Sequence, residues 1–567
     1  MKIIRRNTIL LILVLVLKIN LLSGQVTIGT LDKPVSGALL QLSEGLDDNG
    51  ANSTKGLLLP RVLLNHATLE DVGVDDADLP TEGVIHTGLT VYNPEDTQLF
   101  CEGLYTWDGT QWKDVMIVNT WLFPYTAEDA SLPNSYIVKP GETVLVNIAK
   151  ASAMWKSYGH LMDRGNIELV NFCTPPTAKV LWTDNPNLIE GADATNGWEL
   201  GFADQKNINV SVKSGEYGNA LIGIYIKGKN ANGDIEDIVR WSWHIWVPEG
   251  DPTNENVGYR SNNGRRDYFW MDRNLGAKTA YNTVATTSTS NYGLFYQWGR
   301  KDPFTASSNN TTPTDVALVG AMVSSGWSVV GAPADKNPSV NLRRSITSPE
   351  KMFPASGSAN DWWLYTNNPT DPEFIEFMDT QYLADSEDRW NSEGNKKSPW
   401  DPCPEGWRVP AGSANSSGTA PEDYSPWDHI GITAANNPFS ASNFTITSST
   451  KPRGRIARLT NPKTGTTQNI FFPAAGRRIY DSGRIVTLEE MGFFHTARKR
   501  YSAAAPRVYG QDGVILPNGA NQPGAPNINS TKALLFGHWG AGADYGLRPY
   551  GNMNNPSAAV SVRCVKE

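Results

Sequence analysis

The chain reads Asp401-Pro402-Cys403-Pro404-Glu405-Gly406-Trp407-Arg408-Val409-Pro410, and it closes with Ser561-Val562-Arg563-Cys564 before its last three residues. Two of the four cysteines therefore lie in segments flanked by aromatic residues or punctuated by proline and glycine. Such segments are typical of an exported module with a fixed frame, and not of a cytosolic enzyme with a phosphate loop. In an oxidising compartment such a pair is expected to form a disulfide. We therefore predict that Cys403 and Cys564 pair.

The N-terminus indicates export, which favours this pairing. Basic residues precede the apolar stretch Ile9 to Leu17, which is too short to span a bilayer, and small residues follow it. We predict a signal peptide over residues 1–24, no transmembrane segment in the mature chain, and a protein that is extracellular, on the cell surface or periplasmic. Cys101 and Cys173 fall in different predicted domains, so whether they pair stays open.

Composition predicts several β-rich domains. The chain has 567 residues, of which 10% are aromatic, with 19 Trp and 51 Gly. This length exceeds one core and favours two to four domains, and large rings with many glycines fit loop-rich β structure. The net charge is -9, and no basic run interleaves with aromatic residues. We therefore expect no nucleic-acid partner.

The first module is predicted over residues 25–117. Short β-rich runs alternate there with Gly, Asp and Asn, and Trp107 to Trp112 (WDGTQW) predicts a tight hairpin. These runs resemble an N-terminal module that recurs in secreted proteins of the Bacteroidetes. The resemblance implies a β-rich presentation or attachment piece and suggests lineage more than activity.

The second module, residues 118–250, shows alternation of apolar and polar residues at period two. The alternating residues are Val144, Val146 and Ile148, then Ile208, Val210 and Val212, then Ala220, Ile222, Ile224 and Ile226, and finally Trp241, Trp243, Ile245 and Val247. Alternation predicts strands with one face in a core and the other towards solvent. Several such strands predict a β-sandwich, plausibly immunoglobulin-like.

The tract Trp241 to Trp246 (WSWHIW) allows two interpretations. His244 and Trp246 share one strand face and offer a surface on which a sugar ring can stack. Alternatively, both faces of the strand are covered, one by the core and one by the next domain. We favour the second interpretation, because tryptophan is usually heavily buried.

Five motifs occur in order through residues 251–567. They are WMDRNLGA at Trp270 to Ala277, GLFYQWGRKDPF at Gly293 to Phe304, DPCPEGWRVP at Asp401 to Pro410, FFPAAGRR at Phe471 to Arg478, and the final SVRCVKE. Together they resemble the Fibrobacter succinogenes major paralogous domain of Bacteroidales surface proteins. The resemblance implies an α+β, C-type-lectin-like fold shared with formylglycine-generating enzymes, and it implies binding more than catalysis. This chain departs from the family where Gly492 to Tyr501 carries His and basic residues in place of an aromatic-serine run.

No catalytic or metal-binding pattern stands out. The seven histidines form no H-E-x-x-H or H-x-H pair, and the lectin calcium tripeptides are missing from the sequence. We therefore predict a non-enzymatic protein with no cofactor and no metal. An enzyme acting on surface polysaccharide or on protein stays open as an alternative, because two carboxylates can meet in space from any positions.

A binding surface has a better candidate between Gly492 and Asn555. Aromatic and polar residues flanked by glycine occur there and give large contact area at low entropic cost. The candidate residues are Phe493, Phe494, His495, Arg498, Tyr501, His538, Trp539, Tyr545, Arg548 and Tyr550. Alternatively, about half of them fill a β-rich core.

The expected function is that of a secreted or surface-displayed lectin-like adhesin or fibre accessory. Its partners would be a glycan or protein ligand on a surface, with a surface fibre or membrane protein as a further partner. As a variant, the C-terminal stretch is the target of a diversity-generating element.

Overall fold

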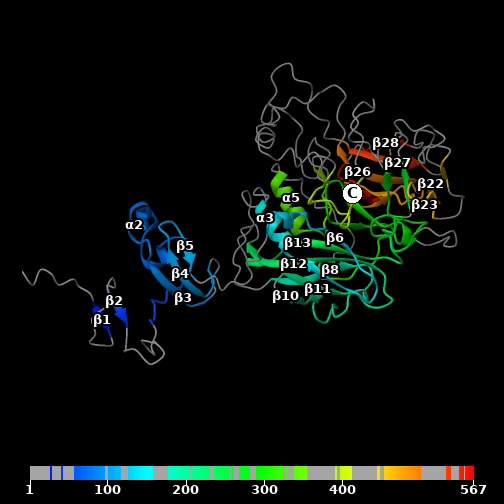
Figure 1. The fold of residues 1–567 in the computed structure, drawn as a ribbon. Helices are drawn as coiled ribbons and strands as arrows, with labels where there is room; N and C mark the ends of the chain where they lie inside the picture. The colour runs from blue at the N-terminus through cyan, green and yellow to red at the C-terminus, as the bar shows by residue number, and fades with distance from the viewer. Residues whose placement is uncertain are drawn as a thin grey trace, which may run out of the picture. The chain divides into compact units, whose positions relative to one another are not determined.

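The computed structural model divides the chain into two compact units, Met1–Met116 and Ile117–Glu567. We call the second unit the head. Described are residues 26–28, 40–42, 57–95, 97, 100–115, 126–157, 176–204, 206–229, 235–255, 257–260, 267–280, 289–323, 327, 338–353, 390–392, 396–410, 443–446, 452–499, 531–537, 548–553 and 556–567 (Figure 1). The predicted signal peptide lies outside these residues. Among them, no helix is long and apolar enough to cross a membrane.

The first unit contains a three-stranded antiparallel sheet, in the order β3-β4-β5, and a separate parallel pair, β1-β2. Its elements are β1 (Val26–Ile28), β2 (Leu40–Leu42), η1 (Glu70–Val72), η2 (Asp76–Asp78), α2 (Leu79–Ile85), β3 (Thr90–Asn93), β4 (Gly103–Trp107) and β5 (Trp112–Asp114). A small core of buried residues, including Leu64, Val91 and Tyr105, lies around the three-stranded sheet.

The predicted hairpin joins β4 to β5. Trp107 is paired with Trp112, and their rings meet edge to face with centroids 5.6 Å apart. The Asp108 carboxylate accepts the N–H groups of Thr110 and Gln111, each at 2.8 Å. Gly109, which lies between Asp108 and Thr110, has φ of 104°, a left-handed conformation that glycine adopts without a steric penalty. The sequence WDGTQW therefore specifies this turn.

The head begins with two sheets, one of three strands in the order β10-β11-β7 and one of five in the order β6-β13-β12-β8-β9. Their elements are η3 (Ala127–Ser131), β6 (Ser135–Ile137), β7 (Thr143–Asn147), α3 (Ala149–Ser157), β8 (Thr177–Thr183), β9 (Glu199–Leu200), β10 (Phe202–Asp204), β11 (Asn207–Ser211), β12 (Gly218–Lys229) and β13 (Ile235–Val247). All four alternating stretches of residues 144–247 thus lie on or beside strands, which confirms the prediction of β structure.

The long strands β12 and β13 differ from the expected half-buried pattern. Residues 218–226 of β12 and 238–247 of β13 are all buried, so both of their faces are covered. The Trp241–Trp246 tract is part of this covered region: Trp241, Trp243 and Trp246 have 0% of their surface exposed. The indole of Trp246 donates to the carbonyl oxygen of Ala277 at 3.0 Å. The buried interpretation of this tract is confirmed.

The remainder of the head is built on an eight-stranded sheet with the path β17-β16-β29-β26-β27-β28, in which β24 pairs with β25 and β29. The elements of this part are β14 (Gly258–Arg260), β15 (Asp267–Phe269), η4 (Thr289–Asn291), β16 (Leu294–Gln297), β17 (Phe304–Thr305), α5 (Pro338–Thr347), β18 (Asn391–Ser392), β19 (Lys396–Lys397), β20 (Trp407–Arg408), β21 (Phe444–Ile446), β22 (Gly454–Thr460), β23 (Thr467–Pro473), β24 (Arg477–Arg478), β25 (Ile485–Val486), β26 (Met491–Lys499), β27 (Thr531–Gly537), β28 (Arg548–Met553), β29 (Ala559–Ser561) and β30 (Val565–Lys566).

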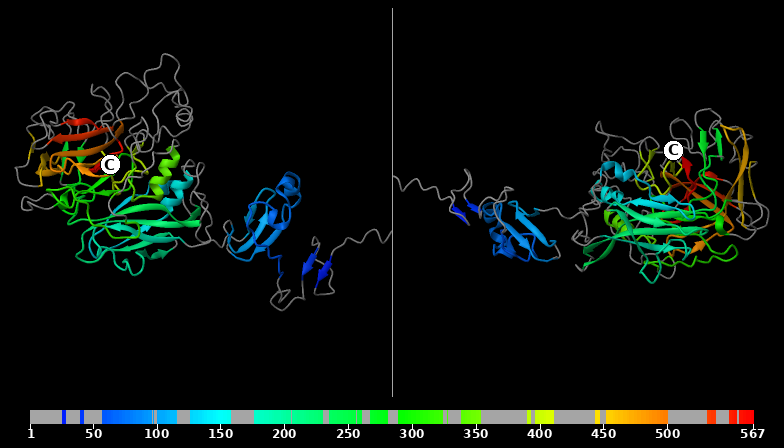
Figure 2. Two further views of the ribbon diagram at one scale, coloured as in Figure 1. Left: turned by 180° about the vertical axis from the view of Figure 1, so that it is seen from behind. Right: turned by 60° about the horizontal axis from the view of Figure 1, so that its bottom comes forward.

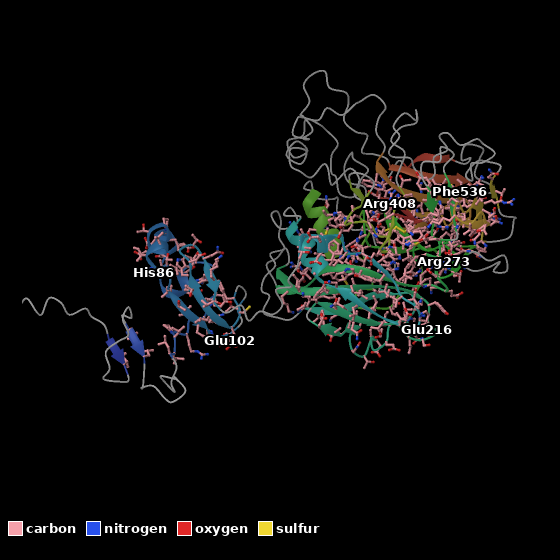
Figure 3. All side chains as sticks on the ribbon, viewed as in Figure 1. His86, Glu102, Glu216, Arg273, Arg408 and Phe536 are labelled. Carbon is pink, nitrogen blue, oxygen red and sulfur yellow. A yellow bond between two sulfur atoms is a disulfide. The ribbon has the colours of Figure 1, made fainter. Side chains whose placement is uncertain are left out.

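One hydrophobic core continues across the predicted domain boundary at residue 250. It joins Trp243 and Ile245 of β13 to Phe295, Trp298 and other residues of the last part of the chain. Figure 2 shows the sheet that contains β12 and β13 on one side of the head and β26–β28 on the other, with the described segments of residues 267–353 between them. The packing of the described side chains throughout this unit can be followed in Figure 3. The parts before and after residue 250 therefore share one core.

Candidate functional site

Three of the predicted binding residues lie in β26 with their side chains buried. Phe493, Phe494 and His495 have 4%, 0% and 0% of their surface exposed. Every residue from Met491 to Ala497 is buried, so this part of β26 is covered on both faces. Here the structure favours the alternative that these residues fill the core, and they offer a ligand no surface.

Each of the three has a packing partner inside the head. The ring of Phe494 stacks on Phe536 at 6.0 Å between centroids, and the guanidinium of Arg477 lies 5.0 Å from the centre of the Phe493 ring. His495 donates from Nε2 to the carbonyl oxygen of Tyr296 at 2.8 Å. These contacts fix β26 as a central strand and account for the burial of its aromatic residues.

The other predicted binding residues are described less completely. Arg498 lies in β26, and Arg548 and Tyr550 lie in β28. Their side chains are outside the described part of the structure, as are the whole residues Tyr501, His538, Trp539 and Tyr545. The structure does describe the strands to which the segments of these residues are attached.

The register of β27 separates these residues into two groups. Lys499 at the end of β26 is paired with Thr531 at the start of β27, so the segment of residues 500–530 is attached at both of its ends to the same end of this strand pair. Residues 538–547 follow Gly537 at the opposite end of β27, a seven-residue strand. At about 3.3 Å per residue, the two attachment points are roughly 20 Å apart. Tyr501 is therefore joined to one end of the strand, and His538 and Trp539 to the other.

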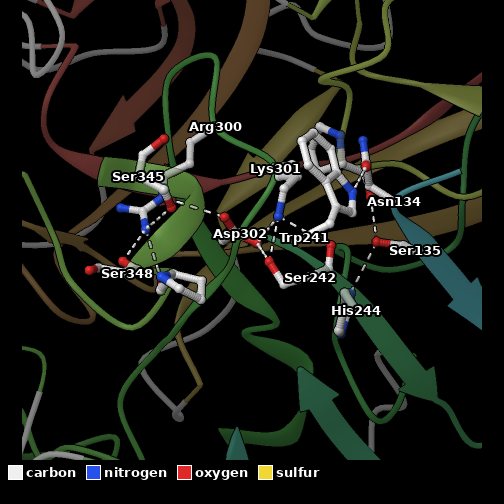
Figure 4. Close-up of polar contacts among 12 residues, drawn as sticks. Asn134, Ser135, Trp241, Ser242, His244, Arg300, Lys301, Asp302, Ser345 and Ser348 are labelled. Carbon is white, nitrogen blue, oxygen red and sulfur yellow. Dashed lines mark hydrogen bonds and ion pairs between the residues drawn. The ribbon is translucent and has the colours of Figure 1, made fainter. Parts of the chain in front are cut away.

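A polar cluster in the head joins residues of β13 to the segment that follows β16 (Figure 4). Lys301, Asp302 and Ser242 have 3%, 2% and 1% of their surface exposed. The Lys301 ammonium donates to the Asp302 carboxylate at 2.6 Å, to the Ser242 carbonyl oxygen at 3.1 Å and to the Ser242 hydroxyl oxygen. The Ser242 hydroxyl in turn donates to the same Asp302 oxygen at 2.6 Å. All three ammonium donors are thus satisfied.

Burial and charge act in opposite directions on Lys301. Removal from water lowers its pKa to about 8, although the adjacent Asp302 carboxylate favours the charged form. The face of the Trp241 ring lies 4.5 Å from the ammonium and offers further attraction. Lys301 therefore stays mostly charged at neutral pH, as an ion pair closed off from solvent.

Arg300 ties α5 and the segment after it to the same region. Its guanidinium donates to the side-chain oxygen of Gln297 at 3.1 Å and to the carbonyl oxygens of Ser348 at 3.2 Å and Pro349 at 3.0 Å. Carbonyl acceptors of this kind hold a chain segment in place without adding charge. Arg300 thus connects β16 to residues 345–351.

The Asp401–Pro410 segment is held from two directions. The side chain of Asn134 donates to the carbonyl oxygens of Pro399 at 2.8 Å and Asp401 at 2.9 Å, and the Ser135 hydroxyl donates to that of Pro402 at 2.6 Å. From within the segment, the Asp401 carboxylate accepts the backbone N–H groups of Cys403 at 2.7 Å and Val409 at 2.8 Å. The first strand of the head therefore fixes the cysteine-containing turn.

Cys403 and Cys564 form the predicted disulfide, with their Cα atoms 6.0 Å apart and both residues fully buried. The adjacent strands β20 and β30 also pair, so the end of the chain is attached by hydrogen bonds as well. Cys101 is disulfide-bonded too, and its partner is outside the described residues. The buried disulfide leaves no thiol at Cys403 or Cys564 for the formylglycine type of chemistry.

The burial of these charged side chains was not predicted from the sequence. Lys150, Arg300 and Lys301 are almost completely buried. The local signals were the small and apolar residues around Lys150 and the aromatic motif that contains Arg300 and Lys301. Within the described ranges, no three His, Cys, Asp or Glu side chains gather as metal ligands would. The network's geometry is that of a scaffold which fixes segments to one another.

Two buried histidines predict loss of stability in acid. Burial lowers the pKa of His244 and of His495 to about 3, so in the folded state they stay neutral where the unfolded chain is protonated. Stability is therefore fully present above the unfolded value of about 6.5 and falls as the pH falls towards 3, by about 1.4 kcal/mol per pH unit for each histidine. Burial raises the pKa of Asp401 to about 6. Between pH 6 and 4 this group therefore offsets the loss of stability from one of the two histidines. Urea unfolding of the head followed by tryptophan fluorescence measures this slope.

The variant His495→Gln is expected to reduce the slope by one proton, about 1.4 kcal/mol per pH unit. His66 is half exposed and lies in the first unit, so His66→Gln serves as a matched control with an unchanged slope for the head. An equal slope in wild type and His495→Gln would contradict a neutral buried His495.

Comparison with known protein families finds a similarity in the N-terminal part of the chain. Residues 27–128 match the model of a phage tail like trimerisation region. The match starts inside β1, covers all the strands of the first unit and reaches η3 of the head. No curated protein and no solved structure matches the chain.

Proposed function

We propose that this chain is a subunit of a trimeric, exported, non-enzymatic surface protein whose head binds a glycan or protein ligand. The observation that carries the proposal is the trimerisation-region match at residues 27–128, placed before a separate compact head. If the first unit forms a trimer, the three linked heads would bind a surface with higher avidity, because linked binding sites gain affinity without any new contact.

The finer fold assignment forms part of the proposal. An immunoglobulin-like arrangement for residues 118–250 is supported by the two sheets that this stretch forms, one of three strands (β10-β11-β7) and one of five (β6-β13-β12-β8-β9). A C-type-lectin-like arrangement for residues 251–567 is supported by the pairing of β16 with β29 and by the disulfide, which both join the end of the chain to earlier segments. A rigid frame of this kind suits recognition by the segments it carries.

The proposed contact residues are those of the predicted set whose side chains lie outside the described part of the structure. They are Arg498, Tyr501, His538, Trp539, Tyr545, Arg548 and Tyr550. Their attachment at two ends of β27 implies either two separate contact surfaces or one elongated surface. Trp539, flanked by Gly537-His538 and Gly540, offers the largest ring for stacking on a sugar.

The test compares residues 25–567 with the head alone, residues 117–567, on one glycan array with host surface proteins included. We expect the longer form to have three times the mass of one chain by light scattering and the head to be monomeric. We also expect the two forms to share a ligand, which the trimer binds at least a hundredfold more tightly through avidity.

Trp539→Ala is expected to abolish the shared binding without changing the mass of the assembly. Leu145 is half exposed on β7, so Leu145→Ala serves as a matched control that keeps both properties. A monomeric long form would contradict the trimer, and silence of both forms across the array would contradict the binding function.

A further inference from the structure

Exposed apolar side chains are concentrated in the first unit. Twelve large hydrophobic residues are exposed in the described part of the chain, and nine of these lie between Ile28 and Val115. The head contributes many more described residues but only Leu145, Val323 and Tyr480. Where such residues form a contiguous patch, the patch commonly marks an interaction site. The excess coincides with the matched trimerisation region.

The parallel pair β1-β2 carries the clearest part of this surface. Ile28 is paired with Leu42, and Leu40 lies two residues before Leu42, so the three share one face of the pair. Their exposed fractions are 57% for Ile28, 56% for Leu40 and 39% for Leu42. Between them in register stand the polar residues Thr27 and Gln41. The pair therefore has one apolar face that the described residues leave open.

Such a pair is incomplete by itself. Among the described strands, β1 and β2 form ladders only with each other. A two-stranded sheet is marginal in water, and parallel strands are normally found with both faces covered. The outer edges of β1 and β2 also present backbone groups that another strand can pair with. Further copies of the same pair packed face to face would cover the open face.

We propose that the face formed by Ile28, Leu40 and Leu42 is the contact through which three copies of this chain associate. This inference rests on the proposed trimeric function and deepens it, because it assigns the surface and its occupant, the same face of two further copies. The argument for that occupant is continuity: the match to a trimerisation region begins at residue 27, within β1 itself. Three apolar faces meeting around one axis would leave the polar positions 27 and 41 outward.

The test measures the mass of the full chain by light scattering for wild type, for Leu40→Ser/Leu42→Ser and for Leu145→Ser. We expect a trimer for wild type, a monomer of one third of that mass for the double variant, and a trimer for the control. Leu145 matches the tested leucines because it is 51% exposed, but it lies outside the matched region. An unchanged near-ultraviolet dichroism spectrum verifies that the variant keeps its tertiary packing, to which the separate core around Trp107 and Trp112 contributes.

The outcomes of this test distinguish an error in the assigned contact surface from an error in the proposed trimeric function. A trimeric double variant overturns the assigned surface and leaves the proposed function standing, with Val84 and Ile85 as the next exposed pair. A monomeric wild type overturns both.

If the double variant does not fold, Leu42→Cys treated with a short bismaleimide provides the second test. We expect covalently linked chains on a denaturing gel, and none for wild type or Leu145→Cys. Cys101, Cys403 and Cys564 are all in disulfides and do not react. Absence of linked Leu42→Cys chains overturns the surface.

Discussion

Replacing Cys403 and Cys564 with serine is expected to lower the free energy of unfolding of the head by about 2–5 kcal/mol. The two cysteines are 161 residues apart in sequence, and a bridge over so long a loop removes much of the entropy of the unfolded chain. The head should still fold, because β20 pairs with β30 and Asn134 and Ser135 hold the same turn by hydrogen bonds. Urea unfolding of wild type and double variant under non-reducing conditions measures the difference.

A reductant provides the control for this experiment. Added to wild type, it should bring the unfolding midpoint down to that of the double variant or below. Added to the double variant, it reveals separately what the disulfide at Cys101 contributes. A double variant as stable as wild type would show that the bridge is dispensable for the frame.

Asp302→Asn is expected to destabilise the head by about 3–5 kcal/mol, because it leaves the buried ammonium of Lys301 without its counter-charge. The Asp302 carboxylate accepts hydrogen bonds from both Lys301 and Ser242 at 2.6 Å, and an amide of the same size retains an acceptor but not the charge. Chemical unfolding at pH 7 measures the loss. Asp481 is exposed, so Asp481→Asn is the matched control and should change stability by less than about 0.5 kcal/mol.

The double variant Lys301→Met/Asp302→Asn distinguishes the cost of an unpaired charge from the loss of a useful bond. Removing both charges should recover most of the stability, since a buried ion pair can often be replaced by apolar groups at little cost. A double variant as unstable as Asp302→Asn alone would mean that packing around Trp241, and not charge, accounts for the effect.

Local patterns predicted much of the fold correctly. The hairpin at Trp107–Trp112 followed from Asp-Gly between two aromatic residues, and the strands of residues 144–247 followed from alternation. The disulfide followed from the compartment and from the punctuated segments around each cysteine. In each case the deciding interaction is close in sequence or is restricted to very few candidates.

The candidate site was predicted less well, because burial depends on what covers a strand. Alternation in β12 and the aromatic run in β26 look the same whether the second face meets water or another layer, and here both faces are covered. Phe493, Phe494 and His495 were therefore placed in a binding surface although they pack inside. The buried ion pair of Lys301 and Asp302 was missed for the same reason: its partners come from β13, far away in sequence.

The register between β26 and β27 has a consequence for engineering. Because Lys499 and Thr531 are paired, the two ends of the intervening segment stand side by side whatever sequence joins them. Doubling the length of a connection between fixed ends costs only about 0.6 kcal/mol. Foreign peptides inserted between these two residues should therefore leave the frame intact. If the first unit forms a trimer, one assembly would display three copies of each insert.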